Sequence, residues 1–456
     1  MAASADFTFL FDLGLAVFAA LGFSYLFSKI KQPVVVGQLV AGIIIGPFGL
    51  GLIQNLNTID LLASLGIILL LFTVGLELDP LEIRKIGPDS FILAIVELTV
   101  TFVLVTLVGI AVGLSQIEAI FAAAVVATTS TAIMSKILLE TKSLRAKESH
   151  TVVTASIIED FATVFMLLLL PGLAAASNQV PPLDLAFLVL KGAFLVGVIF
   201  VFGWRIAPYL IDRMSRGDQE YKETAFLLAL SFGFAFAIFS SYLGFSPAVG
   251  AFLMGLMIRG RQAQFVKEKV GPIKDLFVVL FFVSMGTLIN IGALLTVTLP
   301  IIAVLAVAIF GKFLGCWTGA RLSGARDEAA TVGLSMLPRG EFSFIVAQEG
   351  TGLGVAAQIL YPVAGLVTLI SSILSSKALR GKKVEDPAGC WTALCRIGTL
   401  LGPRGSSHWL VQCTKSCANQ SIANGLDRSP HYRSRLLGLG TMDHPNRSRT
   451  TFRALL

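Results

Sequence analysis

Two adjacent carboxylates, Glu159 and Asp160, lie in the middle of an otherwise apolar run. The run HTVVTASIIEDFATVFMLLLLPG extends from His150 to Gly172 and is long enough to cross a bilayer, which takes about 20 residues. A carboxylate at that depth costs on the order of 2.5–3.5 kcal/mol on insertion scales and by default indicates a functional site. Successive helix residues point about 100° apart, so the two carboxylates face different surroundings. Both are candidate ion- or proton-binding residues, and the simpler alternative is a structural polar pair between helices.

Two further stretches predict breaks inside apolar helices. The first is Ala127–Ala132, ATTSTA, whose consecutive hydroxyls can bond to backbone carbonyls and let a helix unwind. The second is Leu337–Phe342, LPRGEF, in which proline and glycine weaken the helix. Freed carbonyls and hydroxyls suit hard cations, so Thr129 and Ser130 are candidate ion-binding residues. Unwound membrane helices indicate a transporter binding site, whereas small residues also serve plain helix packing.

Three charged residues are candidates to support this site. Lys312 lies inside an apolar run and is the natural cationic partner for Glu159 or Asp160, unless it snorkels to the membrane surface. Arg339 and Glu341 are two positions apart and cannot pair on a regular helix. In an unwound segment they can reach separate partners or offset the dipoles of the half-helices.

Two other charges in apolar runs, Glu97 and Lys191, are interpreted as structural. Each lies nearer the end of its predicted span or lacks a polar setting in the sequence.

The composition is that of a polytopic membrane protein. Of 456 residues, 55% are hydrophobic and 14% are charged, with a mean hydropathy of +0.82. The residues from Lys382 onward carry 11 Lys and Arg against 4 Asp and Glu, which accounts for the net charge of +7. Four of the five cysteines also lie there, so no extracellular disulfide framework is indicated. The first apolar run lacks the features of a cleavable signal peptide.

Apolar runs bounded by charges or turn residues predict an all-α chain with about thirteen membrane spans. The predicted spans are 7–28, 32–47, 58–78, 90–113, 116–138, 150–172, 184–207, 223–243, 245–259, 272–289, 291–320, 327–349 and 355–376. The loops after the odd-numbered spans carry Lys and Arg, and the loops after the even-numbered spans carry neither. The positive-inside rule then predicts an external N-terminus and a cytoplasmic C-terminus.

The sequence also repeats itself. The stretch Pro33–Gly42 is similar to Pro247–Gly255, and their paired glycines are each 213 positions apart. The polar break at Thr129-Ser130 corresponds to Pro338-Arg339 at an offset of 209. By the loop charges, the two halves run in opposite directions. Two inverted repeats with discontinuous helices are therefore predicted, a plan common among secondary transporters.

Four stretches carry a resemblance to a known family. They are LGIILLLFTVGLELD (Leu65–Asp79), FSPAVGAFLMG (Phe245–Gly255), LFVVLFFVSMG (Leu276–Gly286) and PRGEFS (Pro338–Ser343). Together they resemble the cation:proton antiporter superfamily, in its Kef-type sodium or potassium/proton exchanger branch, over roughly residues 5–380.

The resemblance implies crossed broken helices in spans five and twelve, and a homodimer. It implies that Asp160 carries either a proton or a cation and that Lys312 faces the carboxylate pair. Glu159 stands where relatives have aspartate, asparagine or glutamine, so the stoichiometry stays open.

The sequence thus divides into a membrane domain, 1–381, and a basic tail, 382–456, which is interpreted either as a disordered segment or as the product of a non-native reading frame. The tail lacks a G-x-G-x-x-G loop, and the spacing of its cysteines is weak evidence for zinc. The sequence indicates no resident cofactor, no metal beyond the transported Na⁺ or K⁺, and no nucleic-acid partner.

The buried carboxylates of the sequence bear on three possible functions. The expected one is Na⁺ or K⁺ exchange for H⁺ by alternating access. The alternative is a K⁺ efflux channel or ligand-gated pore of the Kef type. An intramembrane hydrolase is disfavoured, because adjacent helical residues diverge too far to flank one bond.

Overall fold

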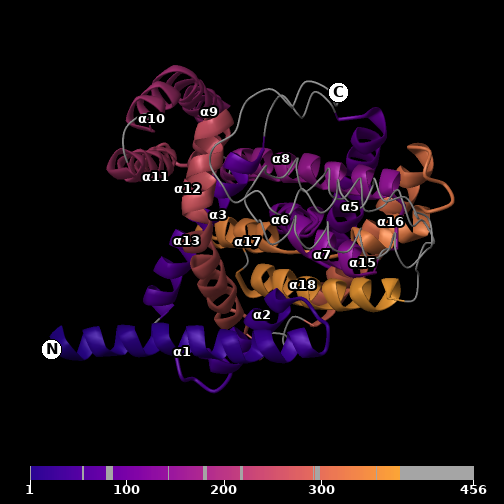
Figure 1. Ribbon diagram of the computed structural model, residues 1–456. Helices are drawn as coiled ribbons and strands as arrows, with labels where there is room; N and C mark the ends of the chain where they lie inside the picture. Colours follow the sequence, from indigo (N-terminus) through magenta and orange to yellow (C-terminus); the bar gives the residue numbers. More distant parts are fainter. Residues whose placement is uncertain are drawn as a thin grey trace, which may run out of the picture. The chain divides into compact units, whose positions relative to one another are not determined.

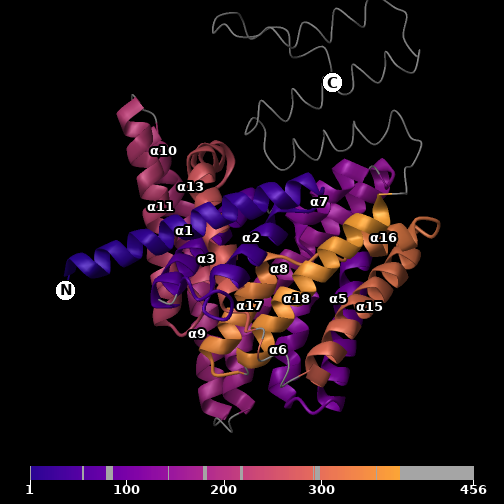
Figure 2. The ribbon, with the colours of Figure 1, turned by 90° about the horizontal axis from the view of Figure 1, so that it is seen from below.

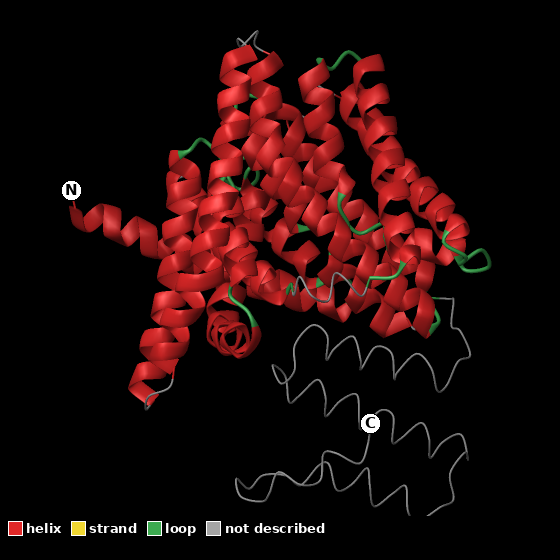
Figure 3. Cartoon of the chain, turned by 90° about the horizontal axis from the view of Figure 1, so that it is seen from above, coloured by secondary structure: helices red, strands yellow, loops and turns green. Residues whose placement is uncertain are grey.

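The computed structural model describes residues 2–53, 56–78, 86–141, 143–177, 182–215, 219–290, 292, 298–355 and 357–380. Within these ranges the regular structure is helical (Figure 3). The predicted basic tail, and its proposed boundary after residue 381, lie outside the described residues.

The first half of the described chain consists of the helices that follow. They are α1 (Ala2–Lys29), α2 (Val34–Ile45), α3 (Leu56–Glu77), α5 (Pro88–Ala111), α6 (Gln116–Ala127), α7 (Thr131–Thr141), α8 (Ala146–Ser177), α9 (Pro182–Val201), a π-helical turn (Phe202–Ile206) and α10 (Ala207–Ser215). The second half continues with α11 (Gln219–Tyr242), α12 (Pro247–Met257), α13 (Gly260–Thr287), α15 (Thr298–Leu322), α16 (Ala329–Ser335), α17 (Glu341–Gly352) and α18 (Ala357–Leu379).

Each predicted span falls on these helices in order, and two spans fall on pairs of half-helices. The breaks predicted in spans five and twelve are confirmed, because α6 stops at Ala127 before α7 begins, and α16 stops at Ser335 before α17 begins. By length and composition, nine helices in the described ranges can cross a membrane. The number of crossings therefore stays a prediction.

One boundary was predicted wrongly. Span ten was predicted to begin at residue 272, but α13 already begins at Gly260 and continues through Pro272. Lys267 and Lys269, predicted to lie in a loop, are therefore helical. Charged residues indicate where a helix leaves the apolar layer, and they do not require that the helix ends there.

Local sequence explains where several helices begin. Ser115 caps α6, since its hydroxyl accepts the backbone N–H of Glu118 while the Glu118 carboxylate accepts the backbone N–H of Ser115. Pro88 and Pro247 each lie in the first turn of a helix, α5 and α12, where the missing N–H is harmless.

The helices pack into two groups (Figures 1 and 2). The glycine bundle contains α1, α2, α3, α11, α12 and α13, and the broken-helix bundle contains α5, α6, α7, α8, α15, α16, α17 and α18. Helix α9 contacts both α8 and α12, and α10 packs on α11 and α13.

Glycines allow main chains to touch in the glycine bundle. A Cβ atom at Gly42 of α2 would overlap the carbonyl oxygen of Val283 on α13. In the same way, a Cβ atom at Gly255 of α12 would overlap the carbonyl oxygen of Phe72 on α3. Small residues permit this close approach between membrane helices.

The short helices α2 and α12 place their two glycines in equivalent contacts. Gly37 of α2 lies against α1 at Phe23, and Gly250 of α12 lies against α11 at Phe236. Each short helix therefore packs its first glycine on the preceding helix and its second glycine on a helix of the other half of the chain.

We predict that Gly42→Ala destabilises the protein. The new methyl group has no space between two backbones, and overpacking of this kind costs about 1–3 kcal/mol. The midpoint of thermal unfolding in detergent should fall. The matched control is Gly22→Ala on α1, where a Cβ atom meets nothing within 4 Å and the midpoint should not fall. Equal midpoints for Gly42→Ala and the parent would contradict the packing described for α2 and α13.

Candidate ion-binding site

The two helix breaks lie against each other. The backbone N–H of Ser130, in the first break, donates to the carbonyl oxygen of Pro338, in the second, at 2.8 Å. The hydroxyl of Thr129 donates to the carbonyl oxygen of Met336 at 3.1 Å. Backbone groups freed in one break thus find partners in the other, as burial requires.

The guanidinium group of Arg339 lies near the C-terminal ends of α6 and α16, the two half-helices that stop at the breaks. Its side chain is fully buried. Its Nε donates to the carbonyl oxygen of Val126 at 2.7 Å and its Nη1 to that of Leu337 at 2.7 Å. Val126 lies in the last turn of α6, and Leu337 lies in the break two residues after α16. A cation is favourable near both helix ends because helix dipoles leave negative charge there.

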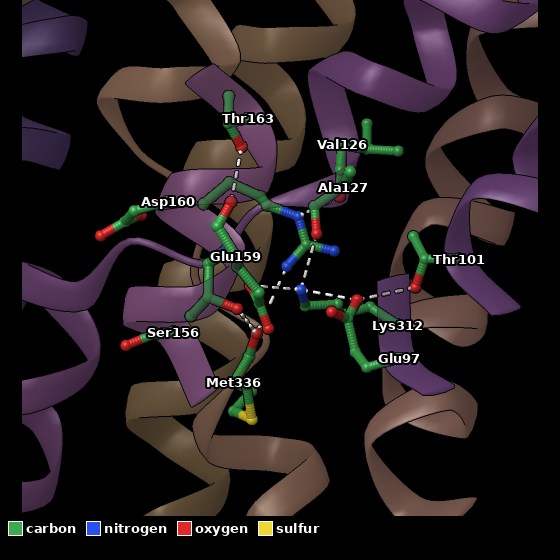
Figure 4. A network of polar contacts seen from close by, with 12 residues as sticks. Glu97, Thr101, Val126, Ala127, Ser156, Glu159, Asp160, Thr163, Lys312 and Met336 are labelled. Atoms are coloured by element: carbon green, nitrogen blue, oxygen red, sulfur yellow. Dashed lines mark hydrogen bonds and ion pairs between the residues drawn. The ribbon is translucent and has the colours of Figure 1, made fainter. Parts of the chain in front are cut away.

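Glu159 faces a buried lysine. The Nζ of Lys312 on α15 lies 2.9 Å from Glu159 Oε2 and 2.6 Å from the Oε1 of Glu97 on α5. The same Nζ donates to the carbonyl oxygen of Ala127 at 2.7 Å. Lys312 and both glutamates have 0% exposed side chains. One ammonium group therefore joins two carboxylates and the C-terminal end of α6 (Figure 4).

Asp160 points to another side of α8 (Figure 4). Its Oδ2 accepts from the hydroxyl of Thr131 at 3.2 Å, and that hydroxyl lies 3.1 Å from the hydroxyl of Ser156. Asp160 is 7% exposed, and its Oδ1 has no protein partner within the described residues. The expected divergence of the adjacent carboxylates is confirmed.

Anionic or hydroxyl groups lie at the half-helices that begin after the breaks. Glu341 is the first residue of α17, and its Oε2 accepts from the hydroxyl of Ser130 at 3.3 Å. The Oγ of Ser130 also accepts the backbone N–H of Ile133 at the start of α7, at 3.4 Å. Since the N-terminal end of a helix is positive, a carboxylate there is stabilising.

The sequence-predicted residues meet in one region, although not all contact Asp160. Glu159, Thr129 and Lys312 are connected, since the Thr129 N–H donates to Glu159 Oε2 at 2.7 Å. The hydroxyls of Thr129 and Ser130 bond to Met336 and Glu341 instead of Asp160. These hydroxyls hold the two breaks together.

Sequence reasoning missed three residues of this region. The hydroxyl of Thr131, and not that of Thr129 or Ser130, donates to Asp160, and the hydroxyl of Ser156 lies 3.1 Å from that of Thr131. Glu97 was interpreted as structural and was not connected to Lys312, but the structure buries its carboxylate against that lysine. Lys191, also interpreted as structural, is exposed on α9.

A sequence signal for the contact with Glu97 does exist. The glycines at 311, 315 and 319 of α15 lie four apart, and a Cβ atom at Gly315 would come within 3.0 Å of Glu97 Cα. Such spacing indicates close packing of membrane helices.

Comparison with known proteins decides the family. Residues 14–380 match the model of the sodium/hydrogen exchanger family, transmembrane. The chain belongs to this family. It is a monovalent cation/proton antiporter of the multi-pass membrane type, and not an enzyme.

Several relatives are similar over most of their length. The Na(+)/H(+)-K(+) antiporter GerN of Bacillus cereus is 29% identical over 378 residues, which cover 82% of this chain and 96% of GerN. The probable Na(+)/H(+) antiporter GerT of the same organism is 30% identical over 334 residues, 72% of this chain and 87% of GerT. K(+) efflux antiporter 5 of Arabidopsis thaliana is 28% identical over 350 residues, 76% of this chain and 61% of that protein.

A solved structure has the same fold. The sodium proton antiporter MjNhaP1 from Methanocaldococcus jannaschii, at pH 8, aligns with a TM-score of 0.64 over 82% of this chain and 97% of that one. The sequences are 19% identical.

We predict that Lys312→Ala is strongly destabilising. The substitution leaves Glu97 and Glu159 without their ammonium partner in a dry interior, and breaking a buried ion pair costs roughly 3–5 kcal/mol. The midpoint of thermal unfolding in detergent should fall sharply. If Lys312 instead extended to the membrane surface, its replacement by alanine would cost little stability. A variant as stable as the parent would favour this alternative.

Proposed function

We propose that Asp160 binds the transported proton and the transported cation in turn, and that this competition couples the two fluxes. The observation that carries the proposal is the buried Asp160 Oδ1, which has no protein partner within the described residues. A buried carboxylate must be neutralised, and in this position either a proton or a cation can do so. Since one group cannot hold both, release of one ion permits binding of the other.

The residues around Asp160 support this role. Thr131 and Ser156 place hydroxyl oxygens beside it, and oxygen ligands suit alkali cations. Glu159 adds a second carboxylate whose Oε1 has no protein partner within the described residues. Thr129 and Ser130 shape the site by fixing the breaks, and Lys312, Arg339 and Glu341 stabilise it electrostatically.

Movement of one bundle against the other would expose the site alternately to the two sides. Side chains that meet edge to edge between the bundles support this. Phe161, beside Asp160, contacts Phe252 of α12 with ring centroids 5.8 Å apart. Phe344 of α17 contacts Phe281 and Phe282 of α13, each at 6.3 Å. The main-chain contacts at Gly42 and Gly255 join helices within the glycine bundle, which supports movement of that bundle as one body.

We predict that Asp160→Asn abolishes cation-dependent proton movement. Asparagine keeps the size and polarity but neither titrates nor attracts a cation strongly. The measurement is dye-reported pH change in proteoliposomes on addition of Na⁺, K⁺ or Li⁺, at matched protein density. Glu159→Gln should be milder, because Asp160 is retained.

Two outcomes would contradict this assignment. Normal exchange by Asp160→Asn, with loss in Glu159→Gln, would make Glu159 the carrier. Cation flux that proceeds without a proton counterflow would favour the channel alternative.

We further propose thirteen crossings in two inverted repeats, with an external N-terminus and a cytoplasmic C-terminus. The matching breaks after Ala127 and Ser335, and the matching use of glycines by α2 and α12, support the repeat. The loop charges support the orientation. A homodimer and a separate tail after residue 381 stay predictions of the sequence.

The orientation predicts a labelling pattern. Single cysteines replace Ser177, at the end of α8, and Ser215, at the end of α10, in a cysteine-free background. An impermeant thiol reagent should modify the first from outside and the second only from inside. The reverse pattern would refute the thirteen-crossing topology.

A further inference from the structure

We propose that Glu97 is a positioning residue of the exchange site, which holds Lys312 while Glu159 engages the transported cation. The inference rests on the proposed function of Asp160 and its neighbour Glu159. It concerns a carboxylate on α5, a helix that contributes no other residue to the proposed ion site.

The ammonium group of Lys312 has a partner for each of its donors. Its three near partners are Glu97 Oε1 at 2.6 Å, Ala127 O at 2.7 Å and Glu159 Oε2 at 2.9 Å. An ammonium group has three N–H donors, so these contacts use all of them. The contact with Glu97 is shorter than the contact with Glu159.

Lys312 and the transported cation compete for Glu159. A cation that binds beside Asp160 also attracts the adjacent carboxylate of Glu159, and it must compete there with Lys312. If Glu159 were the sole anionic partner, the ammonium group could not release it without losing its compensation in a fully buried place. Glu97 supplies a second carboxylate on the other side of the ammonium group, so Lys312 stays compensated when Glu159 turns to the cation.

Glu97 is held through its Oε1, while its Oε2 has no protein partner within the described residues. Its Oε1 also accepts from the hydroxyl of Thr101, one turn along α5, at 2.9 Å. Gly315 lets the backbone of α15 approach α5 at Glu97, because a Cβ atom there would lie 3.0 Å from both Glu97 Cα and Glu97 O. The distance from α5 to Lys312 is therefore fixed by main-chain packing.

The test is Glu97→Gln, which keeps the shape and removes the charge. Of the two carboxylates that contact Lys312, only Glu159 then remains charged, so Lys312 binds Glu159 more tightly and the cation competes less well. In proteoliposomes the apparent KM for Na⁺ or K⁺ should rise by about tenfold, while the maximal rate changes by less than about twofold.

The matched control is Asp89→Asn, the same chemical change on the same helix. Asp89 pairs with Lys147 at 3.4 Å, and both side chains are partly exposed. This variant should keep the parental KM and maximal rate.

Thr101→Val tests the positioning if Glu97→Gln does not fold. It keeps every charge and removes only the hydrogen bond to Glu97, so KM should rise by less than in Glu97→Gln. A role in folding alone would instead lower the unfolding midpoint and leave KM unchanged. Parental KM in both variants overturns the proposal.

A double substitution tests whether Glu97 acts through Lys312. Adding Glu97→Gln to Lys312→Met removes one of the two carboxylates that have lost their ammonium partner. The double variant should therefore unfold at a higher temperature than Lys312→Met. Additive destabilisation would show that Glu97 acts independently of Lys312 and would overturn the positioning role.

Failure of the proposed function has a different signature. Exchange retained by Asp160→Asn refutes Asp160 as the carrier, whatever the KM of Glu97→Gln. Loss of exchange in Asp160→Asn with a parental KM in Glu97→Gln and Thr101→Val refutes only the role of Glu97.

Discussion

The structure depends on compensating helix ends that stop inside the protein. Where α6 and α16 end and α7 and α17 begin, backbone carbonyls and N–H groups have no partner in their own helix. Arg339 and Lys312 lie at the carbonyl ends, and Glu341 and the hydroxyl of Ser130 lie at the N–H ends. Without the breaks, these buried charges would have no free backbone groups to compensate. Without the charges, the carbonyl and N–H groups at the breaks would lose their compensation.

This arrangement leaves Asp160 in a special position. Glu159, its neighbour in the sequence, is bound by Lys312 and by the N–H of Thr129. Asp160 contacts the hydroxyl of Thr131 and no basic residue among its described contacts. Two adjacent carboxylates of one helix thus have different surroundings, since Glu159 contacts a buried ammonium group and Asp160 contacts a hydroxyl group. The 100° rotation between successive helical residues is sufficient to separate them.

Much of the fold could be predicted from apolar runs, because a membrane span must be long and apolar wherever it packs. The breaks could also be predicted, since four successive Thr and Ser residues, or Pro-Arg-Gly, weaken a helix by local chemistry. The start of α13 could not, because charge indicates the membrane boundary and not the helix end.

The partners within the site were harder to predict than the helices. Lys312 was assigned to the carboxylates because it was an obvious buried cation. Glu97 was missed, because its setting is created by α15, which is more than 200 residues away in the chain. The choice between Thr131 and its neighbours Thr129 and Ser130 depends on the path of the unwound backbone, which has no fixed rotation per residue.

The two kinds of contact between helices differ in how they can be tuned. Where Gly42 and Gly255 bring main chains together, no side chain exists that could be exchanged for a slightly larger or smaller one. Where Phe344 meets Phe281 and Phe282, three buried rings meet edge to edge, so a residue of another size there changes how tightly the two bundles pack. The contact between the bundles can therefore vary through its side chains, whereas the main-chain contacts of the glycine bundle cannot.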